Sequence, residues 1–222
     1  MCILYIFYIN SIYCASINVN MFLYLTIYIM IYIIPIIMNE VKLMKLSTKE
    51  MILVSLFTSL TAIGAFLSIP IGEVPITLQS MFSLLSGFLL GPKLGSMSQG
   101  LYVMLGLFGI RIFAGFSGGP QYIFKPSFGF LIGFIFASHI VGKLTYKKPY
   151  SGFRSFLLAS LIGTFVIYAF GIPYMYFSLN YISGVEMDLL TVLKTGCLVF
   201  IPGDLIKAII TSFVASKLVH RI

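Results

Sequence analysis

The chain has 222 residues, of which 59% are hydrophobic and only 9% are charged, and its mean hydropathy is +1.06. A soluble domain usually carries about 25% charged residues, so this composition predicts a polytopic membrane protein. Because one span needs roughly 20 apolar residues, the length allows about six or seven spans and leaves no room for a soluble ATPase or enzyme domain. The net charge of +8 is interpreted as a consequence of membrane topology, and a nucleic-acid-binding surface is not expected.

Residues 1–43 are a hydrophobic N-terminal extension that is biased toward Ile, Tyr and Asn. Its segment Met21–Ile37 is long enough for a short span, but it has neither the basic start nor the cleavage site of a signal peptide. Two interpretations stay open, an extra N-terminal helix or translated upstream sequence ahead of a start at Met44. The second is slightly favoured, because Met44–Glu50 (MKLSTKE) is typical of the basic start of a membrane protein.

Residues 44–222 are expected to form an all-α domain, a bundle of six transmembrane helices. The expected spans are Met51–Pro70, Thr77–Leu90, Leu94–Ala114, Ser127–Val141, Ser155–Phe177 and Gly196–Val219. The second and fourth are short, so either these helices tilt little or the flanking loops enter the membrane.

Ten of the 14 Lys and Arg residues fall on one side of these spans. They are Lys42, Lys45, Lys49, Lys93, Lys143, Lys147, Lys148, Arg154, Lys217 and Arg221. The positive-inside rule places this side in the cytoplasm. The N-terminus of the six-helix domain and the C-terminus are therefore both expected in the cytoplasm, which agrees with an even number of spans.

A glycine-rich loop, Gly109–Phe130, follows the third expected span on the outer side. It carries five glycines and two cations, Arg111 and Lys125. Glycine lets the backbone approach a ligand closely, and irregular backbone near the membrane is tolerated where it lines a cavity. A ligand-contacting loop is the favoured interpretation, and an ordinary flexible turn is the alternative.

Asp204 and Lys207 lie in the otherwise apolar last span, within PGDLIKA. Each charge at a helix centre costs roughly 2.5–3.5 kcal/mol on insertion scales, and residues three apart share one helical face. The favoured interpretation is a polar pocket that faces the bundle interior, where Asp accepts hydrogen bonds and Lys offers a cation. The alternative is an ion pair that only joins helices of the bundle.

Catalytic chemistry is not indicated. Gly115–Gly119 fits G-x-S-x-G, but His139 and His220 fall on the cytoplasmic side, about 30 Å of hydrocarbon from Ser117. The sequence has no Walker A motif, no carboxylate pair and no metal-ligand spacing among its three cysteines. The chain is therefore expected to be no enzyme and to hold no metal or cofactor.

Small residues form a stripe on the first span, where Ser55 and Ser59 are followed by Ala62. Such residues let helices approach closely in lipid. Packing inside the same bundle and docking against another membrane subunit are both open.

Three segments resemble the BioY family, the biotin-specific S components of energy-coupling-factor (ECF) importers. They are IPIGEVPITLQSMFSLLSGFLLGPKLG (Ile69–Gly95), LYVMLGLFGIRIFAGFSGGPQYIFKPSFGFLIGF (Leu101–Phe134) and PGDLIK (Pro202–Lys207). The resemblance covers about Met44 to Ile222 and implies a multi-pass protein of the bacterial cell membrane. It also implies an outward-facing vitamin pocket, and association with an ECF transmembrane coupling subunit and two ATPase subunits that alone use ATP.

The same resemblance implies that the Gly115–Gln121 loop, Asp204 and Lys207 bind substrate and that the first helix meets the partner; the other candidates are proposed for their charge or polarity. Substrate-binding candidates are Asp204 and Lys207, with Gln79, Arg111, Gly115, Ser117, Gly118, Gly119, Gln121 and Lys125. The family's docking stripe on the first helix corresponds to Ser55, Ser59 and Ala62. A homo-oligomer is left open.

Biotin fits these residue types chemically. Asp204 offers acceptors for the N–H groups of the ureido ring, and Lys207, Arg111 or Lys125 offers a cation for the carboxylate. An apolar cover for the rest is offered by four aromatic residues of the glycine-rich loop, Phe113, Phe116, Tyr122 and Phe124. The alternatives are another vitamin, or a membrane assembly protein without a transported ligand.

Overall fold

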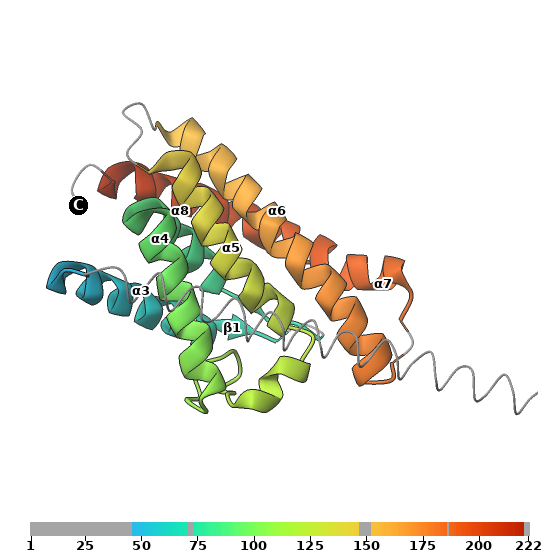
Figure 1. Cartoon of the computed structure of the whole chain (residues 1–222). Helices are drawn as coiled ribbons and strands as arrows, with labels where there is room; N and C mark the ends of the chain where they lie inside the picture. Colours follow the sequence, from blue (N-terminus) through green and yellow to red (C-terminus); the bar gives the residue numbers. More distant parts are fainter. Residues whose placement is uncertain (1–45, 71–72, 147–151, 186, 220–222) are drawn as a thin grey trace, which may run out of the picture. The chain divides into compact units, whose positions relative to one another are not determined.

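The computed structural model describes residues 46–70, 73–146, 152–185 and 187–219 (Figure 1). The hydrophobic extension 1–43, whether it is an extra helix or upstream sequence, lies outside the described residues.

The described chain is mostly helical. The α-helices are α3 (Thr48–Phe66), α4 (Gln79–Leu107), α5 (Phe128–Thr145), α6 (Phe153–Phe177), α7 (Leu189–Leu193) and α8 (Ile201–Leu218). The strands β1 (Ser68–Ile69) and β2 (Ile76–Thr77) pair antiparallel, with Ser68 opposite Thr77. The 3-10 helix η2 is Pro120–Phe124, and π-helical turns η3 (Ser178–Ile182) and η4 (Lys194–Leu198) extend α6 and join α7 to α8.

Four helical stretches of the described residues are long and apolar enough to cross a membrane: Thr48–Phe66, Phe128–Thr145, Phe153–Ile182 and Leu189–Leu218. They correspond to the first, fourth, fifth and sixth expected spans, and the prediction of a helical membrane protein is confirmed. The first ends at Phe66 rather than Pro70, because β1 begins at Ser68. The last begins before Gly196, because η4 makes the chain helical from Leu189 onward.

The second and third expected spans form the two halves of α4, which is broken at Gly91 (φ 84°, ψ −178°) ahead of Pro92. In a straight helix the sequence separation of 23 between Gln79 and Tyr102 would correspond to roughly 35 Å. Instead the Gln79 side-chain amide donates a hydrogen bond to the Tyr102 hydroxyl. The two halves of α4 therefore fold back against each other, and the second half ends at Leu107 rather than at the expected Ala114.

The break at Gly91 gives a prediction for stability. Its φ and ψ values lie in a region open essentially to glycine alone, at a cost of about 1–3 kcal/mol for other residues. A Cβ there would also lie 2.8 Å from the Tyr146 ring. We expect Gly91→Ala to lower the thermal unfolding midpoint in detergent clearly. Gly100→Ala in the second half of α4 is the matched control, because a Cβ on Gly100 would meet nothing within 4 Å, and it should leave the midpoint unchanged or raise it.

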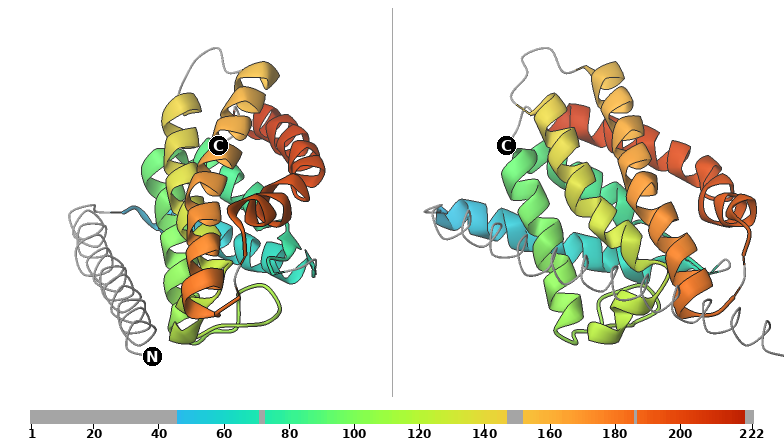
Figure 2. Two further views of the ribbon diagram at one scale, coloured as in Figure 1. Left: turned by 90° about the vertical axis from the view of Figure 1, so that its right-hand side faces the viewer. Right: turned by 45° about the vertical axis from the view of Figure 1, so that its right-hand side comes forward.

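The bundle places α5 between α4 and α6, while α8 packs against both α6 and α4, and α3 packs against α4 (Figures 1 and 2). Glycines allow the closest approaches. A Cβ on Gly87 would overlap the Ser138 carbonyl of α5, and a Cβ on Gly133 would lie 2.9 Å from the Ile167 backbone of α6. Close packing of this kind replaces the hydrophobic effect as the main attraction between helices in lipid.

A buried polar cluster joins α3, both halves of α4 and α5. The fully buried Gln99 amide donates hydrogen bonds of 3.2 Å to Thr61 and Ser86, and Ser86 lies 3.0 Å from the Ser138 hydroxyl. Polar groups inside a bilayer must be paired within the protein, and these groups are paired with one another. The cluster therefore fixes the register of α4 and α5, both of which line the cavity described next.

Candidate functional site

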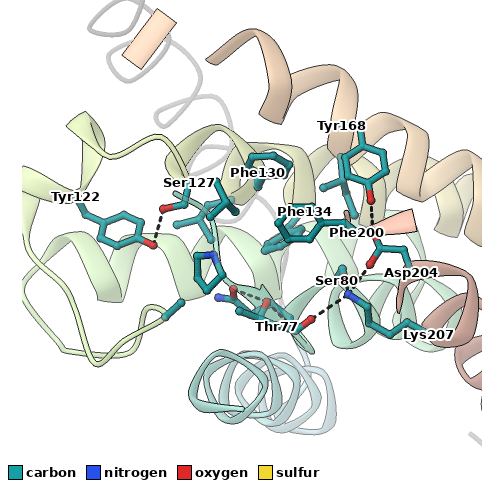
Figure 3. A pocket seen from close by; sticks show the side chains of 16 residues that line it. Thr77, Ser80, Tyr122, Ser127, Phe130, Phe134, Tyr168, Phe200, Asp204 and Lys207 are labelled. Atoms are coloured by element: carbon teal, nitrogen blue, oxygen red, sulfur yellow. Dashed lines mark hydrogen bonds and ion pairs between the residues drawn. The ribbon is translucent and has the colours of Figure 1, made fainter. Parts of the chain in front are cut away.

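A cavity lies among α4, α5, α6 and α8, with the hairpin segment 74–77 and the glycine-rich loop at its edges (Figure 3). It is lined by Val74, Pro75, Thr77, Gln79, Ser80, Ala114, Tyr122, Ser127, Phe130, Leu131, Phe134, Ile167, Tyr168, Phe200, Asp204 and Lys207. Its volume of about 50 Å³ is well below the roughly 300–1,000 Å³ of typical ligand pockets. A ligand the size of a vitamin therefore requires the lining side chains to move apart.

One end of the cavity is charged. Asp204 and Lys207 form an ion pair within α8, and their side chains are only 13% and 11% exposed. The Tyr168 hydroxyl of α6 donates a hydrogen bond to the second carboxylate oxygen of Asp204. Asp204 lies in the first turn of α8, where the helix dipole favours a negative charge. Lys207 and Tyr168 thus each bind one oxygen of Asp204, and together they fix the orientation of the carboxylate.

Lys207 connects α8 to the beginning of α4. Its ammonium group donates to the Thr77 carbonyl oxygen at 3.1 Å and to the Ser80 hydroxyl at 3.2 Å, in addition to the Asp204 contact. An ammonium group has three donors, so these contacts use all of them. A ligand that bonds to Lys207 must therefore replace one of its contacts to Asp204, Thr77 or Ser80.

The other end of the cavity carries hydroxyl groups. The Tyr122 hydroxyl of η2 lies 2.9 Å from the Ser127 hydroxyl. Burial raises the pKa of Tyr122 above its ordinary value, although the neighbouring Ser127 and Ser117 hydroxyls act in the opposite direction. Tyr122 therefore stays protonated at neutral pH and remains a hydrogen-bond donor.

Apolar side chains fill the space between these two ends. Phe130 and Phe134 of α5 lie between Tyr122 and the Asp204–Lys207 pair in Figure 3, and Phe200 lies close to that pair. The cavity thus has a charged end, an aromatic middle and a hydroxyl end.

The expected site residues divide into two groups. Asp204, Lys207 and Gln79 line the cavity. The remaining candidates belong to the glycine-rich loop and do not line it: Arg111, Gly115, Ser117, Gly118, Gly119, Gln121 and Lys125. From this loop and its 3-10 helix, the cavity lining includes Ala114, Tyr122 and Ser127 instead.

The polar groups of the loop are engaged within the loop. The Ser117 hydroxyl donates to the Ala114 carbonyl oxygen at 2.7 Å, and the Gln121 amide donates to the Gly118 carbonyl oxygen at 2.8 Å. Arg111 is exposed, and Lys125 is exposed with its ammonium 5.1 Å from the Tyr122 ring centre. These two cations therefore lie outside the cavity in this conformation, and Lys125 is the one beside its hydroxyl end.

The stripe on α3 faces outward from the described bundle. Ser55 and Ser59 are exposed and Ala62 is partly exposed, whereas Thr58 and Thr61 are buried on the opposite side. The Ser55 and Ser59 hydroxyls donate to carbonyl oxygens one turn earlier in α3. Their polarity is therefore satisfied within the helix.

Several lining residues were not expected from the sequence. Tyr168 is one of many tyrosines in the chain, and the only signal for it was a polar group within an apolar helix. The Thr77 carbonyl oxygen is backbone and gives no signal of its own. Phe130 and Phe134 do not differ in pattern from aromatic residues that pack in the bundle.

Comparisons with known proteins identify the family. Residues 38–222 match the family model described as the BioY family. The chain is 36% identical over 170 residues to the biotin transporter BioY of Thermotoga maritima, and the aligned region covers 77% of this chain and 95% of that protein. It is 40% identical over 177 residues to the probable biotin transporter BioY of Pyrococcus horikoshii, covering 78% and 98%.

A solved structure shares the fold. The crystal structure of the S-component for biotin from an ECF-type ABC transporter matches with a TM-score of 0.68 and 33% identity, covering 78% of this chain and 92% of that one. The resemblance seen in the three sequence segments is thereby confirmed, and the chain belongs to the BioY family.

Proposed function

We propose that this chain is the substrate-binding membrane subunit, or S component, of an ECF-type importer, and that it binds biotin in the cavity of Figure 3 for uptake. One observation carries the proposal: the cavity has two polar ends separated by aromatic side chains. Biotin has the same order of groups, a ureido ring, an apolar thiophane ring and alkyl arm, and a carboxylate. The names of the relatives support biotin over other vitamins.

The charged end suits the ureido ring better than it suits the carboxylate. A cyclic urea presents N–H donors beside a carbonyl acceptor, and Asp204 and Lys207 present an acceptor beside a donor. A carboxylate at this end would meet Lys207, but the charge of Asp204 next to it would repel the ligand. We therefore assign the ureido ring to Asp204 and Lys207, and the carboxylate to the end near Tyr122 and Ser127.

Ligand-dependent stabilisation of the purified protein tests this function. A ligand that binds only the folded state raises the unfolding free energy by RT ln(1 + [L]/Kd). We expect biotin to raise the thermal unfolding midpoint in a concentration-dependent manner, while thiamine and riboflavin have no effect. Stabilisation by one of those two instead would identify an S component for another vitamin. No shift with any of the three would favour an assembly protein without a transported ligand.

The arrangement in the membrane and the partners are part of the same proposal. The two halves of α4 join the four longer helices to give six spans, with Lys143 and Arg154 on the cytoplasmic side. The exposed stripe Ser55, Ser59 and Ala62 would dock on an ECF transmembrane coupling subunit, and two ATPase subunits would supply ATP hydrolysis. The chain itself uses no cofactor and catalyses no reaction.

Labelling of single cysteines checks the orientation. In a background with Cys2, Cys14 and Cys197 replaced by alanine, we expect Gln121→Cys to react with a membrane-impermeant thiol reagent in intact cells. Gly152→Cys, also at an exposed position, should react only after the cells are opened. Reaction of Gly152→Cys in intact cells would reverse the proposed orientation.

A further inference from the structure

Tyr102 connects the cavity to the glycine-rich loop. Its side chain is fully buried in the second half of α4 and does not line the cavity. The hydroxyl accepts a hydrogen bond from the Gln79 amide and donates one to the Ile112 carbonyl oxygen at 3.0 Å. Gln79 does line the cavity, and its amide oxygen accepts a 3.0 Å hydrogen bond from the Thr77 hydroxyl. A continuous chain of hydrogen bonds therefore runs from the loop to a side chain in the cavity.

The glycine-rich loop, where this series of hydrogen bonds ends, is packed firmly against α4. Phe113, next to Ile112, is fully buried, with its ring edge-to-face with Tyr102 at 5.5 Å between centres and 4.4 Å from Tyr122. A Cβ on Gly106 would overlap the Phe113 ring, so only glycine there leaves room for it. The Gly119 amide donates to the Gly106 carbonyl oxygen at 2.7 Å and closes the loop onto α4. The Ile112 carbonyl is thus a fixed acceptor.

We propose that Tyr102 is a positioning residue for substrate binding, and that the glycine-rich loop acts on the substrate through Tyr102 and Gln79. An amide has two N–H groups, and the bond to Tyr102 uses one of those on Gln79. Within the described part of the chain the other has no partner, so it is offered to an acceptor on the substrate. Without the Tyr102 hydroxyl, the Gln79 amide loses the contact that fixes its rotation. This role rests on the proposed biotin-binding function.

Biotin titration calorimetry of detergent-purified protein tests the proposal with Tyr102→Phe, which keeps the ring packed against Phe113. We expect its Kd to rise by about fivefold to tenfold, as for loss of one hydrogen bond. The decisive measurement is the same change in a Gln79→Ala background. There Tyr102→Phe should cause no further loss of affinity, because the amide on which it acts is absent.

Tyr174→Phe is the matched control. It removes another buried hydroxyl that bonds to a backbone carbonyl, that of Ile123, and neither Tyr174 nor Ile123 lines the cavity. It should lower the unfolding temperature and leave biotin affinity unchanged. Thr77→Val is a second variant in case Tyr102→Phe does not fold. It removes the hydroxyl that donates a hydrogen bond to the Gln79 amide oxygen. Its affinity loss should also disappear in the Gln79→Ala background.

The outcomes separate this role from the function on which it rests. Native-like biotin affinity in folded Tyr102→Phe, or in Thr77→Val if only that variant folds, would overturn the positioning role and leave the proposed function standing. An equal loss of affinity with and without Gln79 would also overturn it, since Tyr102 would then act through packing. Absence of biotin binding by the unaltered protein would refute the proposed function and this role together.

Discussion

Replacing Lys207 by methionine should give the largest loss of biotin affinity of any single change in the cavity. Among the described residues that line the cavity, Lys207 carries the only ammonium group, and the variant leaves the Asp204 carboxylate buried with Tyr168 as its partner. Loss of one member of a buried charged contact costs about 2–5 kcal/mol, which corresponds to an increase in Kd of roughly 30-fold to 3,000-fold. Calorimetric titration with biotin measures this increase in Kd directly.

Lys217→Met is the control for this variant, because it removes a cation from the same helix at an exposed position over the Phe213 ring. Its affinity should equal that of the unaltered protein. Biotin methyl ester then tests the assignment of the ureido ring. If Lys207 contacts the ureido carbonyl, Lys207→Met should weaken the ester and the free acid by the same factor. A loss seen only with the free acid would assign Lys207 to the carboxylate instead.

Hydropathy and charge predicted most of the fold, because these properties are local. The helices α3, α5, α6 and α8 lie close to their expected positions. The positions at which helices break or end were harder to predict from the sequence. The expected boundary near Leu90 and Leu94 was correct, since Gly91 and Pro92 stop a helix. The early end of α4 at Leu107 depends on Phe113 folding back over Gly106, which is a tertiary contact without a local signal.

The sequence predicted the site residues only where a charged side chain lies in an apolar helix, which costs free energy in a membrane. Asp204 and Lys207 stand out as charges in an apolar helix, and both lie in the cavity. The glycine-rich loop was also conspicuous, but glycine content does not reveal which side chains face inward. The structure keeps Ser117 and Gln121 bonded within the loop and turns Tyr122 toward the cavity. Lys207 donates to the Thr77 carbonyl oxygen across a sequence separation of 130 residues, and the sequence of neither segment indicates this contact.

Asp204→Asn should weaken biotin binding by a smaller but clear amount. An amide keeps one oxygen, and this cannot accept from both Tyr168 and Lys207 while also accepting from a ureido N–H. A hydrogen bond to a charged group contributes about 1.5–3 kcal/mol, so we expect Kd to rise by roughly 10-fold to 100-fold. Asp188→Asn, at an exposed position ahead of α7, should bind biotin normally.

The double variant Asp204→Asn/Lys207→Met decides between a binding site and an ion pair that only joins helices. Lys207→Met alone leaves a buried charge short of a partner, and the second change removes that charge, so the double variant should unfold at a higher temperature than Lys207→Met. Stability and affinity should then separate: the double variant regains stability but still binds biotin as weakly as Lys207→Met or more weakly. If biotin affinity instead stays native-like in every folded variant while only the unfolding temperature changes, Asp204 and Lys207 serve the bundle alone. Biotin would then have to be held by the remaining cavity residues, whose polar members include Gln79 and Tyr122.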